Sequence, residues 1–167
     1  MKLTSHGKEI IITDFDEIDA LRLAVKLEAD GIKYYTELAK KVGNEDMKKM
    51  LLRLAKEEEK HSAKFRAWLE SRGGQANEEQ DFEGIDTGVF GDIWSVDATL
   101  SKIGSDLDIL SLGEWAELNS INFYKAILKN SESEPGKNTI KDIIKEEQDH
   151  LKAFARFKDL LEKKKSC

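Results

Sequence analysis

A chain of 167 residues with a formal net charge of −6 is long enough for one domain with a real core. Its acidity argues against nucleic acid or an anionic membrane as the main partner, because such partners select clustered Lys and Arg. Abundant Glu, Lys, Leu and Ala with a single proline favour helix throughout, so we expect an all-α protein. No apolar run reaches the roughly 20 residues of a membrane span, and the N-terminus lacks a signal-peptide pattern. We therefore expect a cytoplasmic protein.

Residues 1–13 form an N-terminal arm in which Glu9-Ile10-Ile11-Ile12-Thr13 predicts a short strand or a packed segment. A first helix is expected over 14–42, with apolar residues at steps of three and four and either Asp14 or Asp16 as its cap. Gly43 ends this helix, and Asn44 caps the next one.

A second helix is expected over 45–71, and its apolar stripe includes Glu58 and His61. Residues 73–105 follow as a long polar stretch that still contains Phe82, Phe90 and Trp94. This stretch is too long to join antiparallel neighbours directly, so we expect a crossover between two helix pairs. Its apolar side chains predict packing against the bundle or a neighbouring subunit, and hence a homodimer.

Two further helices are expected over 106–130 and 136–164, and they repeat the polar pattern of the first two at an offset of 89 residues. Each half supplies a lone Glu and then a Glu-x-x-His motif, whose two side chains share one helix face. The matching pairs are Glu28 and Glu117, Tyr35 and Tyr124, Glu58 and Glu147, and His61 and His150. The chain therefore consists of two tandem halves that carry the same set of metal-ligand residue types.

Four carboxylates inside a helical bundle would each cost several kcal/mol without compensation, which makes a metal-free core with all four ionised implausible. Two divalent cations would balance their charge. Carboxylate oxygens with one imidazole per ion suit iron or manganese, and zinc is a competitor because geometry and supply, rather than affinity alone, select the metal.

The pattern of lone Glu, Glu-x-x-His, lone Glu and Glu-x-x-His resembles the ferritin-like superfamily, and within it the rubrerythrin family. The resemblance spans most of the chain and implies a single domain over residues 1–167, folded as a four-helix bundle around two iron ions. It implies that Glu58 and Glu147 bridge the ions and that Glu28 and Glu117 each complete one end. His61 and His150 would each bind one ion.

Tyr35 and Tyr124 each lie seven residues after a lone Glu, nearly two helical turns on. This spacing predicts that they donate hydrogen bonds to ligand carboxylates, with core aromatic packing as the alternative.

The chain departs from the rubrerythrin pattern in two respects. Its only cysteine, Cys167, cannot build the four-cysteine iron site of a rubredoxin-like domain, so electrons must come from a separate rubredoxin-like protein or a reductase. Rubrerythrins also typically carry an additional Glu three residues after the lone Glu of the third helix, where this chain has Ser120. Glu114, one turn before Glu117, is a candidate outer ligand or a residue at the bundle rim.

Three functions fit this pattern. The first is an oxidoreductase that reduces hydrogen peroxide or dioxygen with electrons from an external donor, as the resemblance implies. The absence of the additional Glu puts the rubrerythrin peroxidase cycle in doubt but leaves the dimetal site intact. The second is a ferrous iron oxidation, storage or metal-handling protein. The third is a bundle with a structural metal or none.

Overall fold

The computed structural model describes residues 1–6, 9–75 and 104–165, and this part of the chain is dominated by four long helices. They are α1 (Glu17–Lys41), α2 (Glu45–Ser71), α4 (Asp106–Asn130) and α5 (Glu134–Lys165), and a hairpin of β1 (Lys2–His6) and β2 (Glu9–Thr13) precedes them. The predicted four-helix bundle is confirmed, although the arm is a two-stranded sheet and the protein is not entirely helical.

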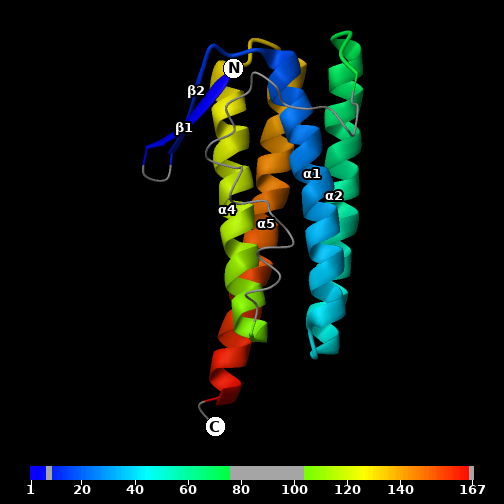
Figure 1. Ribbon diagram of the computed structural model, residues 1–167, viewed down its shortest axis with the longest axis vertical. Coiled ribbons are helices and arrows are strands. Elements are labelled where there is room, and N and C mark those ends of the chain that lie inside the picture. The colour runs from blue at the N-terminus through cyan, green and yellow to red at the C-terminus, as the bar shows by residue number, and fades with distance from the viewer. Residues whose placement is uncertain (7–8, 76–103, 166–167) are drawn as a thin grey trace.

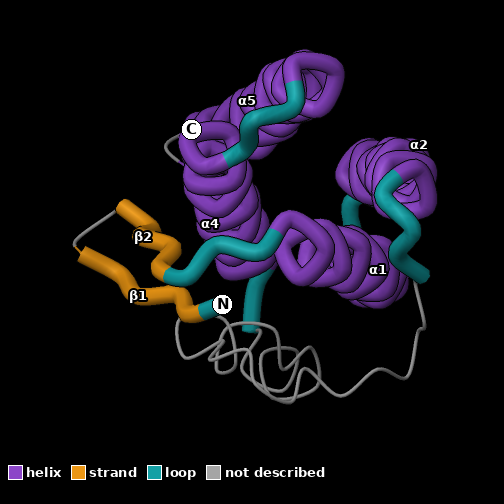
Figure 2. The backbone as a smooth tube through the Cα atoms, turned by 90° about the horizontal axis from the view of Figure 1, so that it is seen from above, coloured by secondary structure: helices purple, strands orange, loops and turns teal. Residues whose placement is uncertain are grey.

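The helices pack as two antiparallel pairs, α1 with α2 and α4 with α5 (Figures 1 and 2). The end of α2 and the start of α4 lie at opposite ends of the bundle, so these two helices run in the same direction (Figure 1). Residues 76–103, with the apolar side chains for which a packed crossover was predicted, lie outside the described residues.

Short polar side chains set the helix starts. Asp16 caps α1 by accepting a hydrogen bond from the Asp19 backbone amide at 2.9 Å. Asp14, the other predicted cap, has a φ of 50° in the left-handed region, which explains why the helix starts at residue 17 rather than 14. Asn44 caps α2 as expected. Helix α5 starts at residue 134 rather than 136, since Pro135 fits a first turn.

Two apolar clusters occupy the two ends of the bundle. One joins the hairpin to the start of α1, the end of α2, the end of α4 and the start of α5, and includes Leu21, Phe65 and Ile127. The other joins the opposite ends of the same helices and includes Leu51 and Phe154. The polar residues singled out by the repeat occupy the middle of the bundle, so apolar packing on both sides holds them in place.

The hairpin adds a small sheet to one side of α4. Strand β2 alternates between exposed and buried residues, and its antiparallel register pairs Leu3 with Ile12. Leu3, Ile10 and Ile12 join the apolar cluster, whereas Ile11 lies on the outer face. The predicted strand is therefore present, and its inward residues cover α4.

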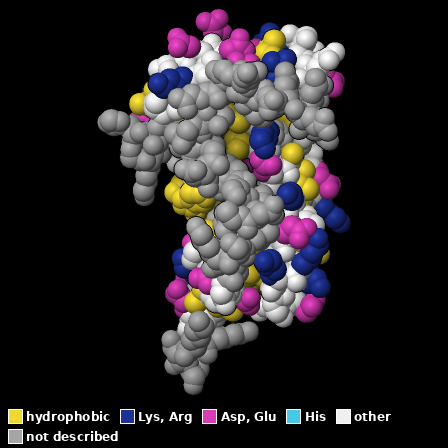
Figure 3. Space-filling view, viewed as in Figure 1, with side chains coloured by type: hydrophobic (Ala, Val, Ile, Leu, Met, Phe, Trp, Pro, Cys, Tyr) yellow, Lys and Arg dark blue, Asp and Glu magenta, His cyan; other side chains and the backbone are white. Residues whose placement is uncertain are grey.

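Acidic and basic side chains intermingle over the helices on the face shown in Figure 3. Several pair along one helix at a spacing of three or four residues, as Lys26 does with Asp30 at 2.7 Å. Within the ranges described, no helix has the length and apolar character that crossing a membrane requires.

Gly113 allows the close approach of α4 and α5, because a Cβ atom there would lie 2.3 Å from the Phe154 ring. We expect Gly113→Val to lower the free energy of unfolding by about 1–3 kcal/mol through overpacking of this buried aromatic. Gly43→Val is the matched control, since a Cβ at residue 43 meets nothing within 4 Å. Urea unfolding under identical metal conditions measures both. Equal stability of the two variants would contradict the packing described here.

Candidate metal centre

The structure brings the six predicted ligand residues together in the middle of the bundle, with each helix contributing at least one. All six side chains are buried. They form two overlapping groups whose potential ligand atoms lie within 4.8 Å of one another. The first group contains Glu28, Glu58, His61 and Glu147, and the second contains Glu58, Glu117, Glu147 and His150. Two groups that share two carboxylates have the composition of a dinuclear site.

The first group surrounds the Nδ1 atom of His61. This nitrogen lies 3.0 Å from Glu147 Oε1, 3.1 Å from Glu58 Oε2 and 3.7 Å from Glu28 Oε2. A single position beside one imidazole nitrogen is therefore within reach of three carboxylates, two of which belong to both groups.

The second group repeats this arrangement around His150. Its Nδ1 atom lies 3.3 Å from Glu58 Oε1, 3.3 Å from Glu147 Oε2 and 3.4 Å from Glu117 Oε1. Glu58 and Glu147 thus present one oxygen to each histidine, whereas Glu28 and Glu117 each face one histidine only. The bridging role of the first two and the terminal role of the others, which the resemblance implies, stay predictions.

Two atoms of the second group are buried without a hydrogen-bond partner among the described residues, His150 Nδ1 and Glu147 Oε2. Buried polar atoms without partners are uncommon and need an explanation. Here both point into a set of carboxylate and imidazole donors that suits iron, manganese or zinc. The residues present therefore fit a metal pair.

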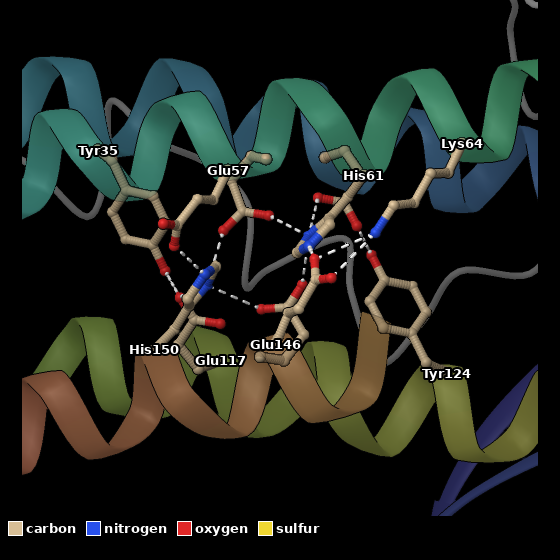
Figure 4. A network of polar contacts seen from close by, with 11 residues as sticks. Tyr35, Glu57, His61, Lys64, Glu117, Tyr124, Glu146 and His150 are labelled. Carbon is tan, nitrogen blue, oxygen red and sulfur yellow. Dashed lines mark hydrogen bonds and ion pairs between the residues drawn. The ribbon is translucent and has the colours of Figure 1, made fainter. Parts of the chain in front are cut away.

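The two predicted tyrosines contact the outer carboxylates. Tyr35 of α1 donates a hydrogen bond to Glu117 of α4, and Tyr124 of α4 donates one to Glu28 of α1 (Figure 4). Both phenols are buried. Tyr124 bonds to Oε1 of Glu28 and leaves Oε2 facing His61. Tyr35 bonds to Oε1 of Glu117, the same oxygen that faces His150. Each hydroxyl thus fixes the orientation of one carboxylate.

Two further carboxylates hold the histidines from outside, and sequence analysis assigned them no role. Glu146 Oε2 lies 2.6 Å from Nε2 of His61, and Glu57 Oε2 lies 2.8 Å from Nε2 of His150 (Figure 4). Both contacts cross between α2 and α5. The signal for them was present in the sequence, since 146 − 57 is also 89. Such partners orient an imidazole with its other nitrogen toward a metal.

The structure places Glu114 and Ser120 away from these contacts. Glu114 accepts a hydrogen bond from Lys158 at 3.0 Å and belongs to neither group of candidate ligands. Of the two roles considered for Glu114, this position favours the bundle rim over an outer ligand. Ser120 is a buried residue of α4 and offers no carboxylate.

The four central carboxylates divide into two kinds. Burial, followed by repulsion from Glu58, raises the pKa of Glu28, and burial with repulsion from Glu147 does the same for Glu117. Burial would also raise the pKa values of Glu58 and Glu147, but their neighbours lower both. For Glu58 these are mainly the two histidines, and for Glu147 they are first Glu117 and then the two histidines. Without metal, protonation is therefore favoured on Glu28 and Glu117 and disfavoured on Glu58 and Glu147.

The histidines complete the charge balance of the metal-free centre. Burial acts to lower the pKa of His61 and His150, but the surrounding carboxylates, first Glu147 for His61 and Glu117 for His150, raise both. The metal-free centre therefore favours positive charge on the two imidazoles beside the ionised carboxylates.

The fold and the family agree with this site. The structure is similar to a Thermotoga maritima protein described as a ferritin-like diiron-carboxylate protein, with a TM-score of 0.67 and 24% sequence identity over 87% of this chain and 95% of that chain. The fold is thus that of a ferritin-like bundle. The sequence model of the rubrerythrin family matches residues 19–158, and the chain belongs to that family. The comparison with curated proteins found no similar sequence.

Metal binding is expected to release about four protons per pair of ions, two from the histidines and two from Glu28 and Glu117. Because the protonated groups bind no metal, the apparent affinity should rise with pH. Titration with Co²⁺ in weakly buffered solution containing a pH indicator measures the release. A Glu28→Gln, Glu117→Gln double variant should release about two. Release close to zero in the unchanged protein would contradict the assigned protonation states.

Removing the carboxylate of Glu57 or Glu146 should weaken metal binding without removing a candidate ligand. We expect Glu57→Gln and Glu146→Gln each to lower Co²⁺ affinity about 10- to 100-fold, because an amide holds the imidazole less firmly and polarises it less. Competition with a chromophoric chelator measures the affinity. Glu59→Gln, at an exposed position of α2, is the control and should bind as the unchanged protein does. Equal affinities in all three variants would refute the role given to Glu57 and Glu146.

Proposed function

We propose that this chain is a di-iron carboxylate oxidoreductase that reduces hydrogen peroxide, or dioxygen, with electrons from a separate donor. The observation that carries the proposal is the buried pair of overlapping ligand groups that share Glu58 and Glu147. Membership of the rubrerythrin family and the likeness to a protein described as a diiron-carboxylate protein support iron as the metal. A metal analysis that finds manganese or zinc in place of iron would contradict this choice of metal.

In this proposal Glu28, Glu58, His61, Glu117, Glu147 and His150 hold the two ions, and a ferrous pair supplies two electrons to the oxidant. Reduction of one hydrogen peroxide to two waters consumes these two electrons and two protons. Tyr35 and Tyr124 keep Glu117 and Glu28 oriented, and the apolar clusters on both sides exclude bulk water.

Ser120 bears on which ligands stay bound during the proposed reaction. Because residue 120 has no carboxylate, it cannot replace His61 as a ligand during the reaction. Glu146 also holds His61 from outside at 2.6 Å. We therefore propose that both histidines stay bound to metal in the reduced and the oxidised protein.

The electron donor is expected to be a rubredoxin-like protein or a reductase, since Cys167 is the only cysteine and cannot form a cysteine-held iron site. A homodimer remains the expected assembly, but the apolar residues on which that expectation rests lie outside the described residues. Size-exclusion chromatography tests it. A very large assembly would favour iron storage instead.

The oxidoreductase predicts that protein purified without oxygen or chelators contains about two irons per chain and, once reduced, consumes about one hydrogen peroxide per iron pair. Glu58→Ala and His150→Ala should abolish this consumption, because each removes a ligand from the centre. Glu114→Ala, which removes only the ion pair with Lys158, should retain it. Anaerobic metal analysis, circular dichroism and a stoichiometric peroxide titration measure these outcomes.

Two results would contradict the proposal. Peroxide consumption unchanged in folded Glu58→Ala protein would place the activity elsewhere. A tightly bound metal that never changes oxidation state would favour a structural site.

A further inference from the structure

A cavity of about 330 Å³ lies between α2 and α5, immediately outside the two histidines. His150 lines it directly, and so do Glu57 and Glu146, which hold Nε2 of His150 and of His61. A larger cavity of about 560 Å³, near Trp68 and Gly136, touches none of the six candidate ligands. Of these two cavities, both lined by residues that the structure describes, the smaller borders the centre.

Several other sides of the centre are covered by residues that the structure describes. Apolar clusters cover the centre toward both ends of the bundle. On the side of α1 and α4, the phenol rings of Tyr35 and Tyr124 lie against the outer carboxylates and are themselves buried. Between α1 and α2, Gly31 packs beside Glu58, since a Cβ on Gly31 would lie in van der Waals contact with Glu58 Cγ at 3.5 Å.

The α2–α5 side differs because its cover is polar and thin. The side chains of Glu57 and Glu146 are 33% and 47% exposed, whereas those of His61 and His150 directly beneath them are 0% and 3% exposed. One layer of carboxylates thus separates solvent from the imidazoles. Figure 4 shows Glu57 and Glu146 between the two helices, with Lys64 beside Glu146.

We propose that this cavity is a binding port for a small, neutral, hydrogen-bonding oxidant of the size of hydrogen peroxide, an inference that rests on the function proposed above. All seven lining residues are ionisable, and none is apolar: Arg53, Glu57, Lys60, Lys64, Glu146, Asp149 and His150. Three cations face three carboxylates, so the port favours neither anions nor cations strongly. Its volume corresponds to about ten waters. Organic hydroperoxides with bulky apolar groups would be excluded, because such groups gain nothing in a charged lining.

Lys60 and Asp149 provide a test, because they line opposite walls of the port, carry opposite charges and are themselves 89 residues apart. In a Cys167→Ser background, Lys60→Cys and Asp149→Cys are each labelled with the neutral reagent benzyl methanethiosulfonate. Glu59→Cys and Gln148→Cys are the controls, since these exposed neighbours do not line the port.

The labelled port variants should react with hydrogen peroxide roughly tenfold more slowly than the labelled controls, as followed by stopped-flow oxidation of the reduced protein. Release of the label by a thiol should restore the rate. Slowing in both port variants indicates a steric block, since the lost charges have opposite signs. A rate that already rises in one unlabelled variant and falls in the other would show a charge effect and overturn the port.

Uptake of Co²⁺ by the metal-free protein, followed by its absorption, gives a readout that does not depend on peroxide chemistry. Slower uptake in the labelled port variants, at an unchanged final stoichiometry, supports the port. Equal uptake and equal oxidation in port and control variants overturn it while leaving the proposed function intact. Failure of the unlabelled protein to bind Co²⁺ would instead refute the metal centre, and the port with it.

Discussion

The structure depends on one constraint, the burial of four carboxylates and two imidazoles in the middle of an apolar bundle. An isolated buried charge costs several kcal/mol, so each of these groups needs a proton, a partner of opposite charge or a metal. Without metal, the raised pKa values of Glu28 and Glu117 favour protons on these two, and those of His61 and His150 favour positive charge on the imidazoles. Divalent cations can satisfy the same requirement by replacing the protons, so proton binding and metal binding at this site are expected to compete.

The same polar layer joins the two helix pairs. Helices α1 and α2 pack as one antiparallel pair and α4 and α5 as the other, and apolar side chains connect them at both ends of the bundle. In the middle, polar contacts make the connection, among them Tyr35 with Glu117, Tyr124 with Glu28, Glu146 with His61 and Glu57 with His150. The first two link α1 to α4, and the others link α2 to α5. Metal binding would therefore act on the interface between the halves, which couples occupancy to the stability of the fold.

The sequence was sufficient to predict the bundle and the central residues because both depend on repeating patterns. The offset of 89 residues selected Glu58 and His61 from a chain in which 36% of residues are charged. The expected helix ranges 45–71 and 106–130 agree with the structure, since Asn44 and Ser105 cap the two helices with their side chains.

The remaining features depend on contacts between elements, which a helical period does not encode. Strand β2 was predicted from its apolar residues, but its partner β1 has the sequence Lys-Leu-Thr-Ser-His, with a single apolar residue, and only the hairpin pairing reveals it. Glu57 and Glu146 stand among many charged residues. Their role appears only once α2 and α5 are placed side by side, because each carboxylate meets a histidine of the other helix.

The repeat also shows where the two halves differ. The six candidate ligands, the two tyrosines, and Glu57 and Glu146 all have a counterpart 89 residues away. Two nearby cations do not, since Lys64 corresponds to Ala153 and Arg53 to Asp142. Lys64 bonds to Glu146 at 3.1 Å, whereas Arg53 lies 3.9 Å from Glu57.

Burial would raise the pKa of Glu146, but His61 and Lys64 outweigh it and lower that pKa. A carboxylate shared with a lysine accepts less strongly from its histidine, so His61 and His150 are polarised to different extents. The two groups of candidate ligands contain the same residue types but therefore differ in their surroundings, and the asymmetry lies on the α2–α5 side.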